Sequence, residues 1–137
     1  MQAKVLILSA ALFAGMAIGA QAADTIKGDP KAGAVVFNQC RQCHHIGKGA
    51  TNFYGPVLNG LIGRPAGTVP GYNYSEANKH SGKVWDVATL TSYLKQPQHD
   101  VPATYMTFKG LTGDQQIADV IAYISQFDTS GAEHEAK

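Results

Sequence analysis

Several features that are common in small proteins are scarce or missing in this chain. Its 137 residues include two cysteines, one tryptophan and three methionines. A zinc site built on the two cysteines would need two further ligands, and no other cysteine is present to supply them. Lysine and arginine number 11 against 10 acidic residues, so no excess of charge points to nucleic acid or an acidic membrane surface as a partner.

Long apolar runs are missing after residue 22. Before that point, Lys4 precedes an apolar run over residues 5–18, and Ala20-Gln21-Ala22 fits the small-x-small rule for a cleavage site. A retained membrane anchor is the alternative, but the run is short for a bilayer span, which needs about 20 residues. We therefore expect residues 1–22 to be a cleaved secretory signal. The mature protein would then lie outside the inner membrane, in the periplasm of a Gram-negative source, with no membrane anchor.

Strand-like alternation and internal repeats are also missing, whereas helical patterns recur. Asp29 is a good N-cap and Pro30 suits a first helical position, so a first helix is expected to begin at residue 30. Four residues at 4-3-4 spacing share one face of it: Gly33, Phe37, Cys40 and His44. The two cysteines are thus predicted to continue the buried stripe of this helix.

Three further helices are predicted from their boundary residues. Ser75 is expected to cap a short helix that runs to Lys79, and Asp86 to cap a longer one that ends before Pro97. A capping box at residues 112–115 is expected to open the last helix. One face of that helix carries the apolar residues Ile117, Val120, Ile121, Ile124 and Phe127.

The rest of the chain is predicted to be irregular. Residues 47–71 contain seven glycines and three prolines, and residues 96–111 show no period. We expect one all-α domain over residues 23–128, with three main helices, a short one and long loops, followed by a flexible polar tail at 129–137. Loops this long count against a compact domain unless they pack on something, and a prosthetic group would serve.

The motif Cys40-Arg41-Gln42-Cys43-His44 points to such a group. Two cysteines three residues apart followed by a histidine form the attachment pattern of a c-type haem. On a helix, residues i and i+3 share a face, so two thiols can each bond one vinyl group of the porphyrin edge. The imidazole of the next residue then reaches the iron from one side.

Other interpretations of the Cys-x-x-Cys pair are a redox dithiol, a lone disulfide and half a zinc site. A thioredoxin-type dithiol normally lies in a βαβ pattern, which this sequence does not show. A lone disulfide stays open, although the adjacent His44 would then be a coincidence. The pattern favours one haem c, bonded to Cys40 and Cys43 with His44 as an iron ligand.

The sixth iron ligand separates an electron carrier from a reactive centre. After residue 22 the chain contains a single methionine, Met106, in an irregular stretch far from His44. A soft thioether opposite a histidine raises the reduction potential. His80 and His99 are the competing ligands, and Met106 could instead only fill core space. The spacing favours Met106.

The sequence resembles the class I cytochromes c, of the soluble bacterial type close to mitochondrial cytochrome c. The resemblance covers about residues 28–127. Besides the haem-attachment motif it rests on these segments: 55–64 (GPVLNGLIGR), 71–79 (GYNYSEANK), Trp85, Tyr93-Leu94 before Pro97, Val101-Pro102 and 106–108 (MTF). It implies the cytochrome c fold, with the helices and loops packed around one covalent haem.

The resemblance also implies roles for single residues. Met106 would be the sixth ligand, and the carbonyl of Pro56 would accept a hydrogen bond from the His44 ring. Three residues would bind the haem propionates: Arg64, Tyr74 and Trp85. Three others would form a polar cluster near Met106: Asn78, Tyr93 and Thr104. Four would form the crossing of the first and last helices: Gly33, Phe37, Val120 and Tyr123.

One departure from the family pattern concerns the lysines that surround the exposed haem edge in mitochondrial cytochrome c. Most matching positions here are uncharged, although Lys48, Lys95 and Lys109 lie in this neighbourhood. Electrostatic steering should therefore be weaker. A more apolar docking face is predicted, with three aromatic candidates: Phe53, Tyr105 and Phe108.

The resemblance implies a soluble one-electron carrier, monomeric and not an enzyme. Its redox partners would be a quinol-oxidising complex, a terminal oxidase or a periplasmic dehydrogenase. Two alternatives stay open: a haem peroxidase, in which peroxide reaches the iron, and a cytochrome subunit bound permanently to a dehydrogenase.

Overall fold

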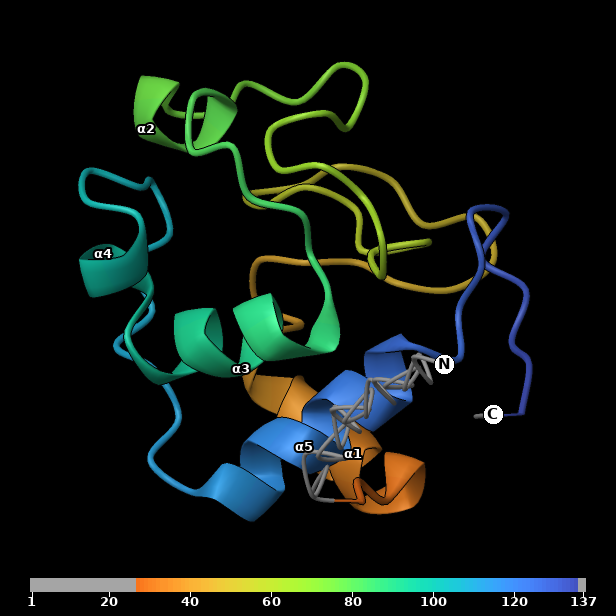
Figure 1. Cartoon of the computed structure of the whole chain (residues 1–137). Coiled ribbons are helices and arrows are strands. Elements are labelled where there is room, and N and C mark those ends of the chain that lie inside the picture. The colour runs from red at the N-terminus through yellow and green to blue at the C-terminus, as the bar shows by residue number, and fades with distance from the viewer. Residues whose placement is uncertain (1–26, 136–137) are drawn as a thin grey trace, which may run out of the picture.

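The structure is a computed structural model that describes residues 27–135, so the predicted secretory signal at 1–22 lies outside the described residues. The elements follow in the order α1 (Pro30–Val36), the 3₁₀ helix η1 (Phe37–Gln39), α2 (Glu76–Lys79), α3 (Val87–Lys95), α4 (Pro97–Asp100) and α5 (Asp114–Ile124) (Figure 1). Strand pairing in this part of the chain is limited to isolated bridges. The predicted all-α class is confirmed.

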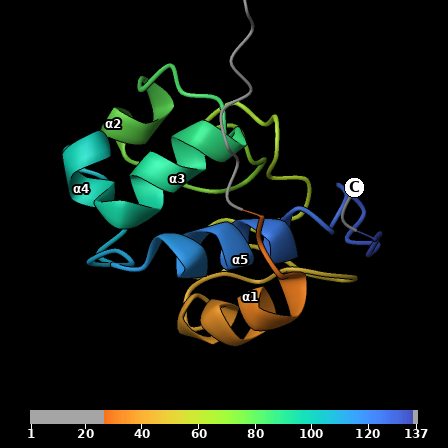
Figure 2. The same ribbon diagram turned by 60° about the horizontal axis from the view of Figure 1, so that its bottom comes forward.

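The crossing of α1 and α5 joins the two ends of the domain (Figure 2). Gly33 of α1 lies so close to α5 that an added Cβ would overlap the carbonyl of Asp119. Phe37 packs on Tyr123 with ring centroids 5.2 Å apart, and Arg41 Nη2 donates to the Tyr123 hydroxyl at 3.0 Å. The predicted crossing of these helices is confirmed, and glycine permits it because a side chain would not fit.

Three of the predicted helix caps are confirmed. The Asp29 carboxylate accepts from Lys31 N, the Ser75 hydroxyl from Asn78 N and the Asp86 carboxylate from Thr89 N. Each satisfies a backbone N–H that has no partner within its own helix.

The capping box predicted at residues 112–115 is wrong. The N-cap of α5 is Gly113, which offers no side-chain acceptor. The Gln115 amide instead donates to Asp119 Oδ1 at 2.8 Å and to the Lys27 carbonyl at 3.1 Å. Asp119 Oδ1 also accepts from Asp29 N at 2.8 Å. Gln115 therefore connects α5 to the segment before α1, which a pattern local to residues 112–115 cannot reveal.

Two further boundaries differ from the sequence prediction. The first helix does not continue unchanged to His44, because it tightens into η1 at residue 37 and then into a turn. Its hydrogen bonding persists, since His44 N donates to the Cys40 carbonyl at 2.8 Å. The stretch 96–111, predicted to be irregular, contains α4, which begins at Pro97. This proline both ends α3 and suits the first position of the next helix.

The core lies between the α1–α5 pair, α3 and the loops. The buried apolar cluster includes Phe37, Leu58, Leu61, Trp85, Leu90, Tyr93, Leu94, Val101, Leu111, Ile117, Val120, Ile121, Tyr123 and Ile124.

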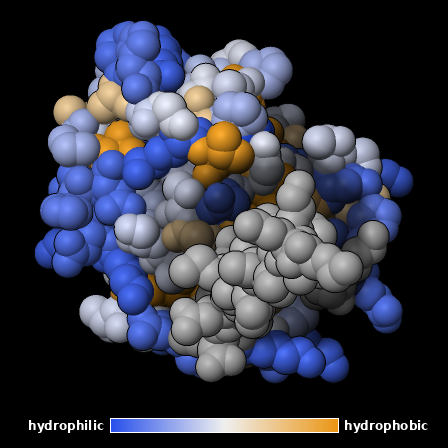
Figure 3. All heavy atoms as spheres, viewed as in Figure 1, coloured by the Kyte–Doolittle hydropathy of each residue, from blue (hydrophilic) through white to orange (hydrophobic). Residues whose placement is uncertain are grey.

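Hydrophilic side chains dominate the left edge of the face drawn in Figure 3, over α2 and α4. None of the helices within residues 27–135 has the length and apolar character needed to cross a membrane.

The segment after α5 does not extend away from the domain. Phe127 forms an isolated bridge with Glu133, and His134 N donates to the Gln126 carbonyl at 2.8 Å. The part of the predicted tail that the structure describes thus makes specific contacts up to His134. The expected flexibility of residues 129–137 stays a prediction.

Candidate haem site

A cavity of about 550 Å³ opens between the Cys40–His44 turn, α3, α5 and the loops around residues 54–75 and 104–108. All residues that the sequence singled out for cofactor binding line it: Cys40, Cys43, His44, Pro56, Arg64, Tyr74, Asn78, Trp85, Tyr93, Thr104 and Met106. Among the residues within 27–135 that line it, Arg64 is the only lysine, arginine, aspartate or glutamate. The walls are otherwise mainly apolar and aromatic, which suits a large flat apolar group.

The two cysteines lie at the cavity wall in the turn after η1. Cys43 N donates to the Cys40 carbonyl at 3.0 Å, which holds the pair in a helical turn, and neither forms a disulfide. Burial, with a smaller contribution from Cys43, raises the pKa of the Cys40 thiol to about 11. A redox dithiol needs a lowered thiol pKa, so the raised pKa of Cys40 argues against that interpretation of the pair. Among residues 27–135 no three or more His, Cys, Asp or Glu side chains are grouped so that they could hold a metal ion.

His44 is held in the geometry and tautomer that an axial ligand needs. Its Nδ1 lies 2.7 Å from the Pro56 carbonyl, an acceptor, so the proton resides on Nδ1 and the Nε2 lone pair is free. Burial lowers the pKa of the His44 ring, while the Pro56 hydrogen bond opposes that shift. The neutral ring is the form that binds a metal.

Gly55 forms the back of this ligand pocket. A Cβ at Gly55 would lie 2.7 Å from His44 Nδ1 and 2.8 Å from Nε2, well inside van der Waals contact. Glycine is therefore the residue that lets the loop before Pro56 pass directly behind the imidazole.

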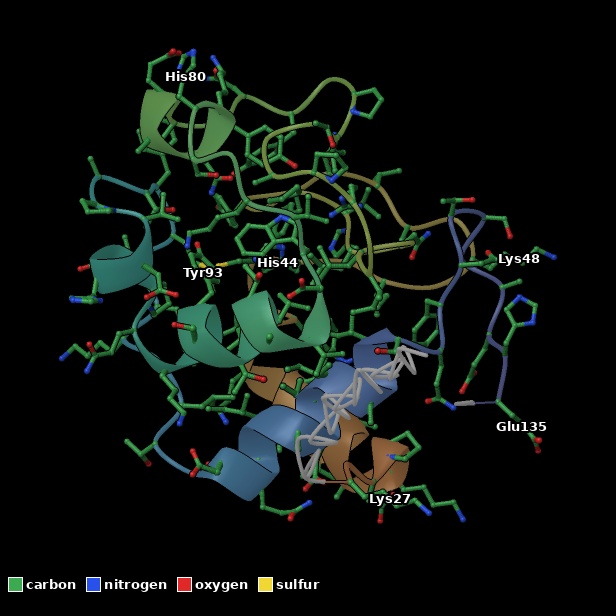
Figure 4. The ribbon with its side chains drawn as sticks, in the orientation of Figure 1. Lys27, His44, Lys48, His80, Tyr93 and Glu135 are labelled. Atoms are coloured by element: carbon green, nitrogen blue, oxygen red, sulfur yellow. The ribbon has the colours of Figure 1, made fainter. Side chains whose placement is uncertain are left out.

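Met106 is fixed by neighbours on α3 and on its own loop. The Tyr93 hydroxyl lies 3.4 Å from both Met106 Sδ and Thr104 Oγ1, and Met106 N donates to Thr104 Oγ1 at 3.3 Å. The labelled side chains of His44 and Tyr93 both point into the interior above α3 (Figure 4). Asn78 lines the same cavity but makes no hydrogen bond to Tyr93 or Thr104, so only part of the polar cluster that the resemblance implies is bonded together.

Arg64 presents an unused hydrogen-bond donor at the cavity. Its Nη1 and Nη2 donate to the carbonyls of Asn59 and Val57 at 2.9 and 3.1 Å. Its Nε is buried and has no partner among the described residues. A buried unpaired donor on a cation is costly, and a carboxylate is its natural acceptor. The carboxylates of haem would supply this acceptor.

Two aromatic residues complete this side of the cavity. Trp85 packs on Tyr93 with ring centroids 4.8 Å apart, and the Tyr74 hydroxyl lies 3.4 Å from Val69 N. Burial raises the pKa of the Tyr74 phenol, so it remains a neutral donor at ordinary pH. The residues present therefore fit a haem: two thiols at one wall, a free imidazole nitrogen, a thioether, apolar walls and a cation without an anion.

Some supporting residues were not found from the sequence. Tyr72 donates from its hydroxyl to the Tyr54 carbonyl at 2.6 Å, and both residues line the cavity. Asn52 Oδ1 accepts from Val57 N at 3.0 Å, and its amide donates to the Pro70 carbonyl at 3.0 Å. The asparagines in a glycine-rich loop were the available signal, but their partners are distant backbone atoms.

Comparison with known proteins shows the family of this chain. The cytochrome c family model matches residues 30–128. A cytochrome c2 of Rhodoplanes tepidamans is 50% identical over 103 residues, which are 75% of this chain and 96% of the relative. A cytochrome c2 of Blastochloris viridis is 43% identical over 121 residues, 88% of this chain and 95% of the relative.

The fold agrees as well. The solved structure of cytochrome c2 from Rhodospirillum centenum superposes with a TM-score of 0.71 at 36% identity, covering 74% of this chain and 99% of that one. These relatives are electron-transfer proteins. The chain therefore belongs to the cytochrome c family, and its cofactor is a covalently bound haem c.

Proposed function

We propose that this cytochrome c shuttles single electrons between redox proteins outside the inner membrane, with His44 and Met106 as the axial ligands of its haem iron. The observation that carries the proposal is the lining of one cavity by Cys40, Cys43, His44 and Met106, each held by its own backbone or side-chain contacts. When bound, the haem supplies the Fe(II)/Fe(III) couple, while the protein supplies ligation, burial and a docking face.

The contacts around His44 and Met106 suit an electron carrier, because they hold both ligands in place while the iron changes its oxidation state. The Nδ1–H···O bond to Pro56 fixes the orientation of His44 and makes Nε2 more basic. The Tyr93 hydroxyl at Met106 Sδ draws electron density from the thioether. The two bonds act on the potential in opposite directions, since a more basic histidine favours Fe(III) and a weaker thioether donor favours Fe(II).

Filled axial positions also argue against the peroxidase alternative. A peroxidase needs an open position at the iron and an acid–base group beside it. His99 lies close to Met106 in the sequence, but its side chain is 80% exposed and lies against Asp100. It is absent from the cavity lining, so this histidine is not placed to exchange protons with peroxide at the iron.

The mouth of the cavity supports a docking face with little charge. Phe53, Tyr54 and Tyr105 are 50%, 75% and 64% exposed, and the latter two line the cavity. Phe53 stacks on His45 with centroids 5.0 Å apart and contacts Tyr54 at 4.4 Å. Phe108, the remaining sequence candidate, is half-buried and packs against the core instead.

We propose that these exposed aromatic residues meet the redox partner: a quinol-oxidising complex, a terminal oxidase or a periplasmic dehydrogenase. Such a face buries apolar area on docking and depends little on opposite charges. The rate of reduction by the natural donor should therefore fall only weakly as salt is added. A steep fall with ionic strength would contradict this docking mode.

Export fits the same function, because residues 1–22 carry the secretory pattern and haem c is expected to be attached after export. The carrier itself is tested by an optical redox titration of the haem-loaded protein purified from its source, with gel filtration alongside. A one-electron Nernst curve, a monomeric elution volume and negligible peroxide turnover are expected. Fast peroxide turnover would favour the enzyme, and co-elution with a dehydrogenase would favour the bound subunit.

A further inference from the structure

The chain after α5 folds into a compact reversal, residues 127–134, which we name the C-terminal clasp. The Asp128 carboxylate organises it, with Oδ1 accepting from Ser130 N at 2.8 Å, Ser130 Oγ at 2.6 Å and Ala132 N at 3.0 Å. Oδ2 lies 2.9 Å from His134 Nε2. The family model ends at residue 128, so most of the clasp lies beyond the part of the chain that it matches.

The C-terminal clasp packs against the loop at residues 47–60, which follows the haem-attachment turn in the sequence (Figure 1). The Phe127 carbonyl accepts from Gly60 N at 3.1 Å. Gly131 is buried with φ of +81°, and a Cβ there would overlap the Gly47 carbonyl and lie 2.6 Å from Asn59 Nδ2. The clasp thus touches both ends of the 47–60 loop, and at Gly131 the contact leaves no room for a side chain.

The same loop residues position Arg64. Asn59 closes the loop, because Gly47 N donates to Asn59 Oδ1 at 2.8 Å and Asn59 Nδ2 donates to the Gly47 carbonyl at 3.0 Å. The backbone carbonyl of Asn59 then accepts from Arg64 Nη1 at 2.9 Å. Val57, in the same loop, accepts from Nη2 at 3.1 Å. Three contacts therefore connect Gly131 to the guanidinium of Arg64, a residue that lines the haem cavity. Its Nε is buried and has no partner among the described residues.

We propose that the C-terminal clasp is a positioning element for Arg64: by closing the 47–60 loop, it fixes the carbonyls that aim the guanidinium at a haem carboxylate. Because Nη1 and Nη2 are both committed to backbone carbonyls, the direction of Nε follows the loop. A loop that loosens would let the guanidinium turn away and weaken its hold on the ionised carboxylate. The proposal depends on haem occupying the cavity, but not on which residue is the sixth ligand or which proteins are partners.

Gly131→Ala is the variant that tests it, with Gly49→Ala as the matched control. Gly49 lies in the adjoining turn with φ of +75°, and a Cβ there would meet nothing within 4 Å. Both variants thus carry a similar left-handed backbone penalty, but only Gly131→Ala also separates the clasp from Gly47 and Asn59. The measurement is the midpoint potential of the haem-loaded protein between about pH 5 and 9, whose dependence on pH reports ionisation of a carboxylate near the iron.

In Gly131→Ala the ionisation constant of that carboxylate should fall by about threefold or more, since its ionised form loses a fixed cation. Gly49→Ala should change it much less. Arg64→Lys should shift the profile in the same direction, and adding Gly131→Ala to Arg64→Lys should add little further. Amide exchange at Gly47 and Gly60 should quicken in Gly131→Ala.

A shift in Gly131→Ala no larger than in Gly49→Ala would overturn the proposal, whether or not exchange at Gly47 quickens. A shift that persists in the Arg64→Lys background would also overturn it, because the clasp would then act by another route. If Gly131→Ala fails to fold, a chain that ends at Asp128 removes residues 129–134 of the clasp, Gly131 included, without inserting a methyl group, and the same outcomes decide.

Discussion

Gly55→Ala is the most local test of how the protein holds its histidine ligand. The new Cβ would overlap His44 Cε1 and lie 2.7 Å from Nδ1, so the ring must withdraw by about 1 Å to bring its nearest atom to ordinary contact at 3.4 Å. The φ of Gly55 is not in the left-handed region, so alanine adds no backbone strain of its own there. The perturbation therefore falls almost entirely on the imidazole and its hydrogen bond.

The size of the effect follows from two contributions. Overpacking a filled site costs about 1–3 kcal/mol. The hydrogen bond from Nδ1 to Pro56, now 2.7 Å, would stretch out of range and remove about 0.5–1.5 kcal/mol. Together they predict a loss of about 1.5–4.5 kcal/mol in the free energy of unfolding. The reduction potential should rise, because a less basic histidine stabilises Fe(III) less well.

Urea unfolding and an optical redox titration of the haem-loaded protein measure both effects. Gly33→Ala is the control, because its Cβ would overlap the Asp119 carbonyl at the α1–α5 crossing, away from His44. It should lower the free energy of unfolding and leave the potential nearly unchanged. The reasoning would be refuted if Gly55→Ala were destabilised while its potential stayed at the wild-type value, since the His44–Pro56 bond would then have no electronic role.

Two other predictions concern separate parts of the molecule. Tyr93→Phe removes the hydroxyl that lies 3.4 Å from Met106 Sδ, so the thioether becomes a better electron donor to iron. The reduction potential measured by redox titration should therefore fall, with the fold retained. An unchanged or higher potential would count against an electronic role for that contact. Hydrogen bonds, first from Ser130 and then from His134, lower the pKa of Asp128. The ionised carboxylate therefore stabilises the fold above the ordinary aspartate pKa of about 3.9, and this stabilisation is lost as the pH falls below that value. The urea midpoint of Asp128→Asn should therefore differ less between about pH 7 and pH 3 than that of the wild type; an equal difference would show that other carboxylates dominate.

Features that depend on neighbours in the sequence could be predicted. The haem-attachment motif lies within five residues, and Met106 is the single methionine after residue 22. The caps Asp29, Ser75 and Asp86 act on backbone amides two or three residues away. Because the motif and the caps depend on residues close together in the chain, and Met106 on the count of methionines, the sequence alone was enough to predict them.

Features decided by distant partners could not be predicted from local pattern. The capping box at 112–115 failed because the Gln115 amide bonds to Asp119 and to the carbonyl of Lys27, 88 residues away. The bonds of Asn59 to Gly47, and the contact of Gly131 with that loop, also involve backbone atoms of Gly47. The residue types at these positions do not predict which backbone atoms they contact. For Arg64 the resemblance implied a role at the haem, while only the structure shows that it donates to the carbonyls of Asn59 and Val57.

The assignment of His44 and Met106 as axial ligands is the central claim, and the absorption spectrum of the oxidised haem-loaded protein tests it most directly. A sulfur-to-iron charge-transfer band in the near infrared should be present near neutral pH and should disappear in Met106→Leu. A wild-type protein without that band, or a band that survives in Met106→Leu, would contradict the account.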